Sequence, residues 1–327
     1  IPDILKESGA HIVEVGSTNR TRIEDFRRGI TSETGALLRV HPSNFTMVGF
    51  TEAPPLQELI DLGQEFGVPV LVDLGSGCLI DTSQYGLSQE PTPSDILKAG
   101  ANLVFFSGDK LLGGPQSGIV AGGDLYIQTL AKHPLARALR IDKLSLAALE
   151  MTLSHYLKSQ FASKIPIWKL IGTPLDNLLA RANDYRKNLE EWWNHMASQV
   201  VYREDGTLSA TMYSFLDGFP FEDPNKGNLL TIKQGFSTIG GGSLPGETLA
   251  TYLLVFQPRI RDGLAMGTPK VQRLADLLRT GKPPVIGRIE DNKVLLDLRT
   301  ILEEQDELTK EAVKTALREW ITDTSPK

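Results

Sequence analysis

The chain contains 327 residues, enough for one large and one smaller domain. Of these residues, 41% are hydrophobic and 23% are charged, which is typical of a soluble globular protein. No apolar run approaches the roughly 18 residues that suggest a membrane span, and no export signal opens the sequence, so we expect a cytoplasmic protein. The net charge of −6 lacks the surplus of basic residues that is usual in nucleic-acid-binding proteins. The single cysteine, Cys78, excludes an internal disulfide.

The chain begins at Ile1, without an initiator methionine, and enters patterned sequence almost at once. Ile12, Val13 and Val15 predict a strand that runs into Gly16. Because a natural domain rarely starts so abruptly, we expect a fragment of a longer protein.

The first half alternates short apolar runs with helical patterns. Helices are expected from Pro54 to Gly67 and from Pro93 to Gly100, because proline favours the first helical turn and glycine the end. Strands are predicted between and around them at 36–40, 68–72, 103–106 and 119–121. Strands that are apolar throughout and alternate with helices predict a parallel α/β sheet covered on both faces.

The second half has a different texture. Amphipathic patterns predict long helices at 144–161 and 175–196 and a final helix at 307–320. Short strands are predicted at 211–216, 229–233, 285–290 and 294–298. We therefore expect a large domain over 1–165, followed over 166–327 by a linking helix and a small α+β domain.

Two predicted strands end in residues suited to pyridoxal 5'-phosphate (PLP) chemistry. Ligands of open parallel sheets lie at the carboxyl ends of strands, where this chain has Asp73 and the segment Ser107-Gly108-Asp109-Lys110. PLP needs a lysine amine for its aldehyde, an acid against its pyridine nitrogen and donors for its phosphate. Lys110, Asp73 and Ser107 meet these needs, and the glycines around Lys110 are expected to leave space for the cofactor.

Each of these residues also has a plainer explanation. Taken alone, Asp73 is better read as a helix cap or turn residue, and most lysines are solvated surface residues. The pairing of Asp73 with Lys110, at the ends of two predicted strands, favours a cofactor site.

Several motifs resemble the bacterial selenocysteine synthase family, the L-seryl-tRNA(Sec) selenium transferases. The likeness includes FSGDKLLGGPQ at 106–116 and VDLGSG at 72–77, and it continues at 13–20, 137–143, 240–246 and 283–290. The resemblance implies a fold-type I PLP-dependent transferase. Its parallel-rich large domain, 1–165, would bind PLP and lack its N-terminal part, and a smaller α+β domain would follow.

The resemblance also implies the reaction. PLP would form a Schiff base with Lys110, and seryl-tRNA(Sec) would be converted to selenocysteinyl-tRNA(Sec) by selenophosphate through an aminoacrylyl-tRNA intermediate. The freed Lys110 would remove the α-proton, and Asp109 would assist proton transfer or orient the lysine. The family further implies a homo-oligomer built from dimers, and an N-terminal tRNA-binding domain that precedes the point where this chain begins.

Arg137 and Arg140 match arginines that the family uses for the selenium donor. Residues three apart share a helix face, and guanidinium groups suit tetrahedral oxyanions, although a pair of solvated helix arginines is the commoner case.

Other motifs carry less weight. The five histidines lack metal-ligand spacing. His41 follows a strand, and two interpretations stay open: it approaches the active site, or, as is commoner, it has a turn or packing role. The Gly-rich segment 240–243 predicts a tight turn or a close backbone contact. Two alternatives stay open: a PLP-dependent lyase acting on a small amino acid or amino sugar phosphate through the same Lys110 and Asp73, and an inactive truncated relic.

Overall fold

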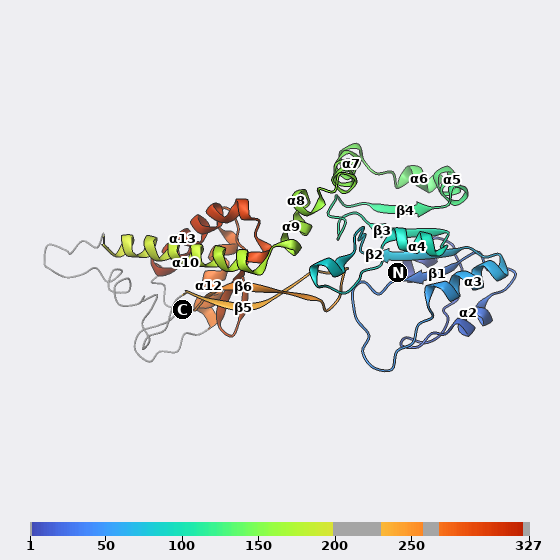
Figure 1. Cartoon of the computed structure of the whole chain (residues 1–327), viewed down its shortest axis with the longest axis horizontal. Helices are drawn as coiled ribbons and strands as arrows, with labels where there is room; N and C mark the ends of the chain where they lie inside the picture. The colour runs from blue at the N-terminus through green and yellow to red at the C-terminus, as the bar shows by residue number, and fades with distance from the viewer. Residues whose placement is uncertain (1, 199–229, 258–267, 323–327) are drawn as a thin grey trace. The chain divides into compact units, whose positions relative to one another are not determined.

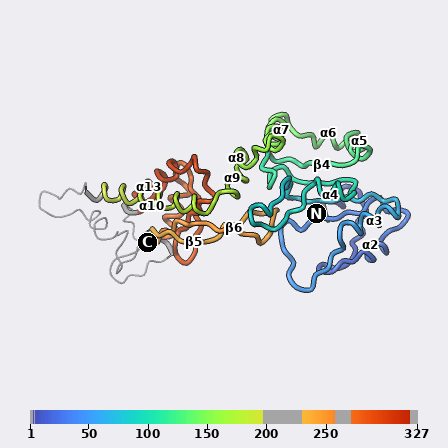
Figure 2. The backbone as a smooth tube through the Cα atoms, viewed as in Figure 1, coloured from blue at the N-terminus to red at the C-terminus, as the bar shows by residue number. Residues whose placement is uncertain are grey.

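The structure, a computed structural model, describes residues 2–198, 230–257 and 268–322. The chain divides into two compact units, and its course is drawn in Figures 1 and 2. The first unit comprises Ile1–Trp168 and Thr238–Glu247, and the second comprises Lys169–Ser237 and Thr248–Lys327. None of the helices in these described ranges combines the length and apolar character that a membrane span requires.

The sheet of the first unit has the strand order β1-β2-β3-β4. β1 (Leu37–Val40), β2 (Val70–Gly75) and β3 (Leu103–Ser107) are parallel, while β4 (Gly118–Gly122) is antiparallel to β3. The predicted parallel α/β sheet is thus confirmed for three strands. The fourth reverses because only the loop 108–117 separates it from β3, and a parallel crossover needs a longer connection.

The helices between the parallel strands match the sequence expectation. α3 (Leu56–Phe66) ends at Gly67, and α4 (Pro93–Ala99) ends at Gly100, both glycines having left-handed backbone conformations. These helices pack on the sheet and fix the strand ends that carry the site. The buried core here contains Leu37, Leu59, Ile60, Leu62, Val70, Val72, Leu74, Ile96, Ala101, Val104 and Phe106.

The start of the chain does not form the expected strand. After α1 (Pro2–Glu7), residues 11–15 lie outside any strand, and Val13 is 57% exposed. β-Branched residues favour a strand only where a partner strand and a buried face are present, and this segment has neither within the described residues. α2 (Ile23–Gly29) follows it.

A series of helices completes the first unit and leads into the second. The helix expected over 144–161 is interrupted, because Ser159 has a positive φ of 54°. The elements are α5 (Asp124–Lys132), α6 (Pro134–Ala138), α7 (Lys143–Leu157), α8 (Phe161–Lys164) and α9 (Pro166–Gly172).

The second unit contains a sheet with the order β5-β6-β8-β7, in which β6 and β7 are each antiparallel to β8. The predicted α+β class of this region is confirmed, but the sequence analysis missed β6 and α12. The strand expected at 211–216 lies outside the described residues. The elements are α10 (Leu175–Ser198), β5 (Leu230–Thr238), β6 (Thr248–Phe256), α12 (Thr268–Thr280), β7 (Arg288–Glu290), β8 (Lys293–Asp297) and α13 (Asp306–Thr322).

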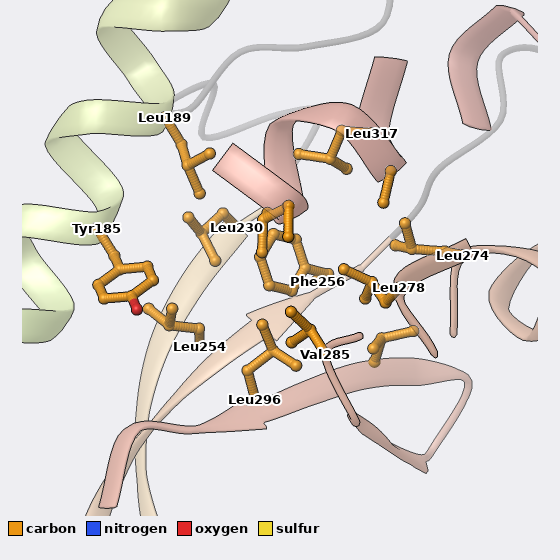
Figure 3. Close-up of a cluster of buried hydrophobic side chains, with 14 of the residues drawn as sticks. Tyr185, Leu189, Leu230, Leu254, Phe256, Leu274, Leu278, Val285, Leu296 and Leu317 are labelled. Carbon is orange, nitrogen blue, oxygen red and sulfur yellow. The ribbon is translucent and has the colours of Figure 1, made fainter. Parts of the chain in front are cut away.

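The core of the second unit forms where α10, the sheet, α12 and α13 meet. Figure 3 shows Phe256 among Leu230, Leu254 and Leu278, with Leu317 approaching from the helical side. Phe256 is 1% exposed, so this core excludes water from a large aromatic side chain and stabilises the unit by hydrophobic burial.

Candidate active site

β2 carries Asp73 to the carboxyl edge of the first sheet. Asp73 is opposite Val40 of β1 and Phe105 of β3, and the register shifts between Asp73 and Gly75. The strand therefore continues past the predicted end at residue 72 and bulges at the aspartate. Asp73 Oδ1 accepts a hydrogen bond from Gly75 N at 3.1 Å, which holds the half-buried carboxylate against the bulge.

The loop that carries Lys110 closes on itself after β3. Gly108 N donates to Ser117 O at 2.9 Å, and Gly114 N donates to Gly108 O at 2.8 Å. Gly113 N donates to Lys110 O at 2.9 Å. Because these bonds fix the backbone on both sides of Lys110, the lysine has a defined position instead of lying on a loose surface loop.

A further backbone bond joins this loop to the segment after Asp73. Leu111 N donates to Ser76 O at 3.0 Å. The loops at the ends of β2 and β3 are thereby tied together, as expected for residues that serve one site.

Two glycines distant in sequence border the Lys110 amine. A methyl group at Gly242 would lie 2.7 Å from Lys110 Cε and 2.9 Å from Nζ, and one at Gly75 would lie 3.6 Å from Nζ. Both glycines have positive φ, 83° and 71°. Gly242 belongs to the segment 238–247 that clusters with the first unit, so the close backbone contact predicted for 240–243 is confirmed.

The glycines beside Lys110 in sequence allow the loop to pack closely. A methyl group at Gly108 would meet Ser117 Oγ and would lie 2.8 Å from Pro115 O, and one at Gly113 would meet Ile165. These glycines let the loop fold on itself and on its neighbours, and the expectation that they leave room for a cofactor stays a prediction. The free space at the amine comes from Gly75 and Gly242.

Tyr156 supports the Lys110 loop from α7. Its hydroxyl donates to Leu112 O at 2.9 Å, lies 3.2 Å from Leu111 O and accepts from Trp168 Nε1 at 2.6 Å. Burial raises the pKa of Tyr156, so the hydroxyl keeps the proton that it donates. Leu111 and Leu112 are 1% and 0% exposed, and they anchor the loop beneath the lysine.

Ser107 and Asp109 flank the same loop. Ser107 is the last residue of β3, is half-buried and pairs with Gly118 of β4. Asp109 is exposed and immediately precedes Lys110. Their proximity to the lysine is consistent with the predicted roles, which stay predictions.

Arg137 and Arg140 do not share a helix face. Arg137 lies in α6, but this helix ends at Ala138, and Arg140 follows it. The helix is short because Asp142, two residues further on, caps α7 by accepting hydrogen bonds from Leu144 N and Ser145 N. Both arginines are exposed, and the described contacts do not join them to the Lys110 loop, so their binding of a selenium donor stays a prediction.

Sequence reasoning missed Ser43, Ser76 and Glu90. Ser76 Oγ and Glu90 Oε1 are buried and have no hydrogen-bond partner in the described part of the chain. The position of Ser76 in the motif after Asp73 was a usable signal. Glu90 gives none, since nothing in its neighbouring sequence shows that the residue is 3% exposed.

Comparison with known proteins shows which protein family the chain is similar to. The family profile "L-seryl-tRNA selenium transferase" matches residues 1–210 and 222–302. The chain is 41% identical over 317 residues to the L-seryl-tRNA(Sec) selenium transferase of Carboxydothermus hydrogenoformans, and 40% identical over 320 residues to that of Geobacter sulfurreducens. These alignments cover 97% and 98% of this chain but 59% and 60% of the relatives, so the chain spans about three fifths of their length.

A solved structure supports the fold. The structure of D-glucosaminate-6-phosphate ammonia-lyase aligns with a TM-score of 0.54 at 18% identity and covers 98% of this chain and 66% of that chain. A likeness at this identity concerns architecture alone. With the observed sheets it confirms the predicted fold-type I α/β class.

Proposed function

The chain belongs to the L-seryl-tRNA selenium transferase family, and from this premise we propose that it forms the catalytic part of an enzyme that converts seryl-tRNA(Sec) to selenocysteinyl-tRNA(Sec). Selenophosphate is the proposed selenium donor. The observation that carries the proposal is the Lys110 amine, held by a closed loop at the end of β3 and bordered by the glycines at 75 and 242.

The site fits PLP as its cofactor. Lys110 would hold the aldehyde carbon, Asp73 would face the pyridine nitrogen and Ser107 would donate to the phosphate. The absence of side chains at Gly75 and Gly242 supports this fit, because a methyl group at Gly242 would occupy the space of the amine. When bound, PLP supplies an electron sink that lowers the cost of removing a proton from the substrate α-carbon.

Lys110, Asp109 and Asp73 have separate proposed roles in the reaction. The Lys110 amine, once free, takes the proton from the seryl α-carbon, and the fixed loop directs it to that atom. Asp109, next in the chain, orients this amine or exchanges protons with it. Asp73 accepts a hydrogen bond from Gly75 N, which keeps its carboxyl group in place for the pyridine nitrogen.

Arg137 and Arg140 are proposed to bind selenophosphate. Their exposed guanidinium groups offer paired donors to a tetrahedral oxyanion without the desolvation cost of a buried charge. Because they lie on either side of a helix end, both reach a common ligand only if it sits at the α6–α7 junction.

The assembly and location complete the proposal. We infer a homo-oligomer built from dimers, acting in the cytoplasm, with a PLP-binding domain over 1–165 and a linking helix and small domain over 166–327. The first unit presents large apolar side chains to solvent along α5 to α7, which supports a protein contact there. They are Leu125, Leu130, Leu135, Leu139, Leu144, Leu146, Met151, Leu153 and Leu157.

The direct test supplies purified protein and PLP with seryl-tRNA(Sec) and selenophosphate, and measures selenocysteinyl-tRNA(Sec). We expect product that requires both substrates and disappears in Lys110→Ala. Turnover of small amino acids or amino sugar phosphates, with none of seryl-tRNA(Sec), would instead identify a lyase. Failure to turn over either substrate would support the inactive relic.

A further inference from the structure

His41 lies beside the candidate active site. It follows β1 directly, and its backbone N–H donates to Asp73 O at 2.7 Å. Two residues later, Ser43 Oγ lies 2.9 Å from the position that a methyl group at Gly75 would take, and that position is 3.6 Å from Lys110 Nζ. The turn that begins at His41 therefore borders the space in front of the lysine amine.

Glu90 is the acidic neighbour of His41. Its Oε1 lies 3.7 Å from His41 Nε2, and the side chains are 4% and 28% exposed respectively. Within the described ranges, Glu90 Oε1 accepts no hydrogen bond, and no lysine or arginine lies within the ion-pair distance of 4.0 Å. Among the described residues, the His41 imidazole is therefore the basic group that faces this buried carboxyl group.

The position of Glu90 is fixed by its backbone. Glu90 N donates to Thr82 Oγ1 at 2.9 Å, and Thr82 Oγ1 donates to Ser88 O at 2.5 Å. Thr82 is 0% exposed. A carboxylate held in this way selects the proton-bearing nitrogen of a neighbouring imidazole. The separation of 3.7 Å is longer than a hydrogen bond, so this positioning requires the half-exposed His41 ring to rotate toward Glu90.

We propose that His41 protonates the leaving hydroxyl group of the seryl substrate, and that Glu90 is the positioning residue that holds its imidazole. The proposal rests on the proposed function, because that reaction must expel a β-hydroxyl group. Hydroxide is a poor leaving group, and a positioned acid removes this difficulty.

The step balances as follows. The Lys110 amine accepts the proton from Cα, and the Cα–H electron pair becomes the second bond between Cα and Cβ. The Cβ–O bond breaks, and the oxygen keeps that bond's electron pair and takes a proton from the His41 imidazolium, leaving as water. His41 becomes neutral and regains its proton from solvent.

Leaving-group dependence tests the proposal. With seryl-tRNA(Sec), His41→Asn should slow elimination by about 10²- to 10⁴-fold, and Glu90→Gln by up to about 100-fold, as expected for a misplaced acid. Chloride departs without a proton, so with β-chloroalanyl-tRNA both variants should recover to within about tenfold of the wild type. Equal losses with both substrates would overturn the acid role, because a merely structural defect affects both alike.

Glu247→Gln is the matched control. Glu247 accepts a hydrogen bond at 2.5 Å from the hydroxyl of Ser88, a residue close in sequence to Glu90. Among the described residues, no hydrogen bond or ion pair joins Glu247 to His41. This variant should retain wild-type rates with both substrates.

A second readout needs neither cofactor nor turnover. In ¹⁵N spectra of the cofactor-free protein, Glu90→Gln should shift the His41 ring signals, which His41→Asn assigns by their loss, whereas Glu247→Gln should leave them in place. An unshifted His41 signal in Glu90→Gln would contradict the inference that Glu90 positions the His41 imidazole. Wild-type protein that fails to convert seryl-tRNA(Sec) would count against the proposed function, whereas normal conversion by His41→Asn would overturn only the role of His41.

Discussion

Lys110 of the first unit is half-buried and Lys310 of the second is buried, and the two lysines have opposite surroundings. Lys310 in α13 is 3% exposed, contacts Asp184, lies 2.6 Å from Glu307 Oε1 and stands 5.3 Å from the Tyr185 ring centroid. Burial lowers its pKa, but the hydrogen bonds to the two carboxylates outweigh this and raise the pKa overall. Lys310 is therefore held as a cation that stabilises the second unit.

Lys110 lacks these neutralising contacts. Its amine lies against Gly75 and Gly242, and no carboxylate of the described residues is within 4.0 Å of it. The amine is therefore not engaged in an ion pair with these residues, which suits a lysine that is to bond with an aldehyde. The surroundings of Lys310 suit a structural role, whereas those of Lys110 are compatible with the chemical role that we propose for it.

The largest effect is expected from Gly242→Ala. The methyl group would lie 2.7 Å from Lys110 Cε and would require a positive φ, at a combined cost of about 2–4 kcal/mol. PLP affinity, measured by titration of the visible absorbance, should fall roughly 30- to 1000-fold. Gly241→Ala is the control, because a methyl group there meets nothing within 4 Å. Equal PLP affinities of the two variants would contradict the inference that Gly242 borders the Lys110 amine.

Lys310→Met should destabilise the second unit without affecting the site. We expect the free energy of unfolding, measured with urea, to fall by about 2 kcal/mol, less than for a fully buried pair because both carboxylates are solvated. Lys187→Met, which removes a lysine that is 75% exposed in its side chain, should change little. Since the folded pKa of Lys310 is above 10.5, its contribution persists at neutral pH and is lost only as pH rises beyond that value. An unchanged free energy of unfolding would show that Lys310 does not stabilise the second unit.

Tyr156→Phe should have a smaller effect, spread over stability and cofactor binding. It leaves Trp168 Nε1 and Leu112 O without their partner, at a cost of about 1–3 kcal/mol in thermal or urea unfolding. Tyr126→Phe, whose hydroxyl makes only a 3.4 Å contact with Asn102, is the control. If both variants unfold alike, Tyr156 does not support the Lys110 loop.

The smallest change is expected at Cys78. Burial raises the pKa of this thiol to about 11, so it stays protonated at pH 8, and its side chain is 0% exposed. A thiol reagent such as dithiobisnitrobenzoate should react only after the protein is unfolded. Rapid reaction of the native protein would show that the segment after Asp73 opens readily, contrary to its tie to the Lys110 loop.

Local patterns were sufficient to predict the strand–helix alternation and the two strand ends. Asp73 and Lys110 were found because each follows an apolar strand, and strand ends gather at one edge of a parallel sheet. The glycines at 75 and 242 could not be assigned to the lysine amine, because their contact joins segments far apart in the chain. The shared face of Arg137 and Arg140 failed because spacing alone does not reveal that a helix ends between them.

The assignment of Lys110 as the cofactor lysine is tested most directly by adding PLP to the purified protein and recording its visible absorbance. We expect an imine band in the wild type that is abolished in Lys110→Ala. The band should be retained in Lys98→Ala, which removes an exposed lysine of α4. A band that persists in Lys110→Ala would assign the cofactor to another lysine, and a wild type without any band would contradict the assignment itself.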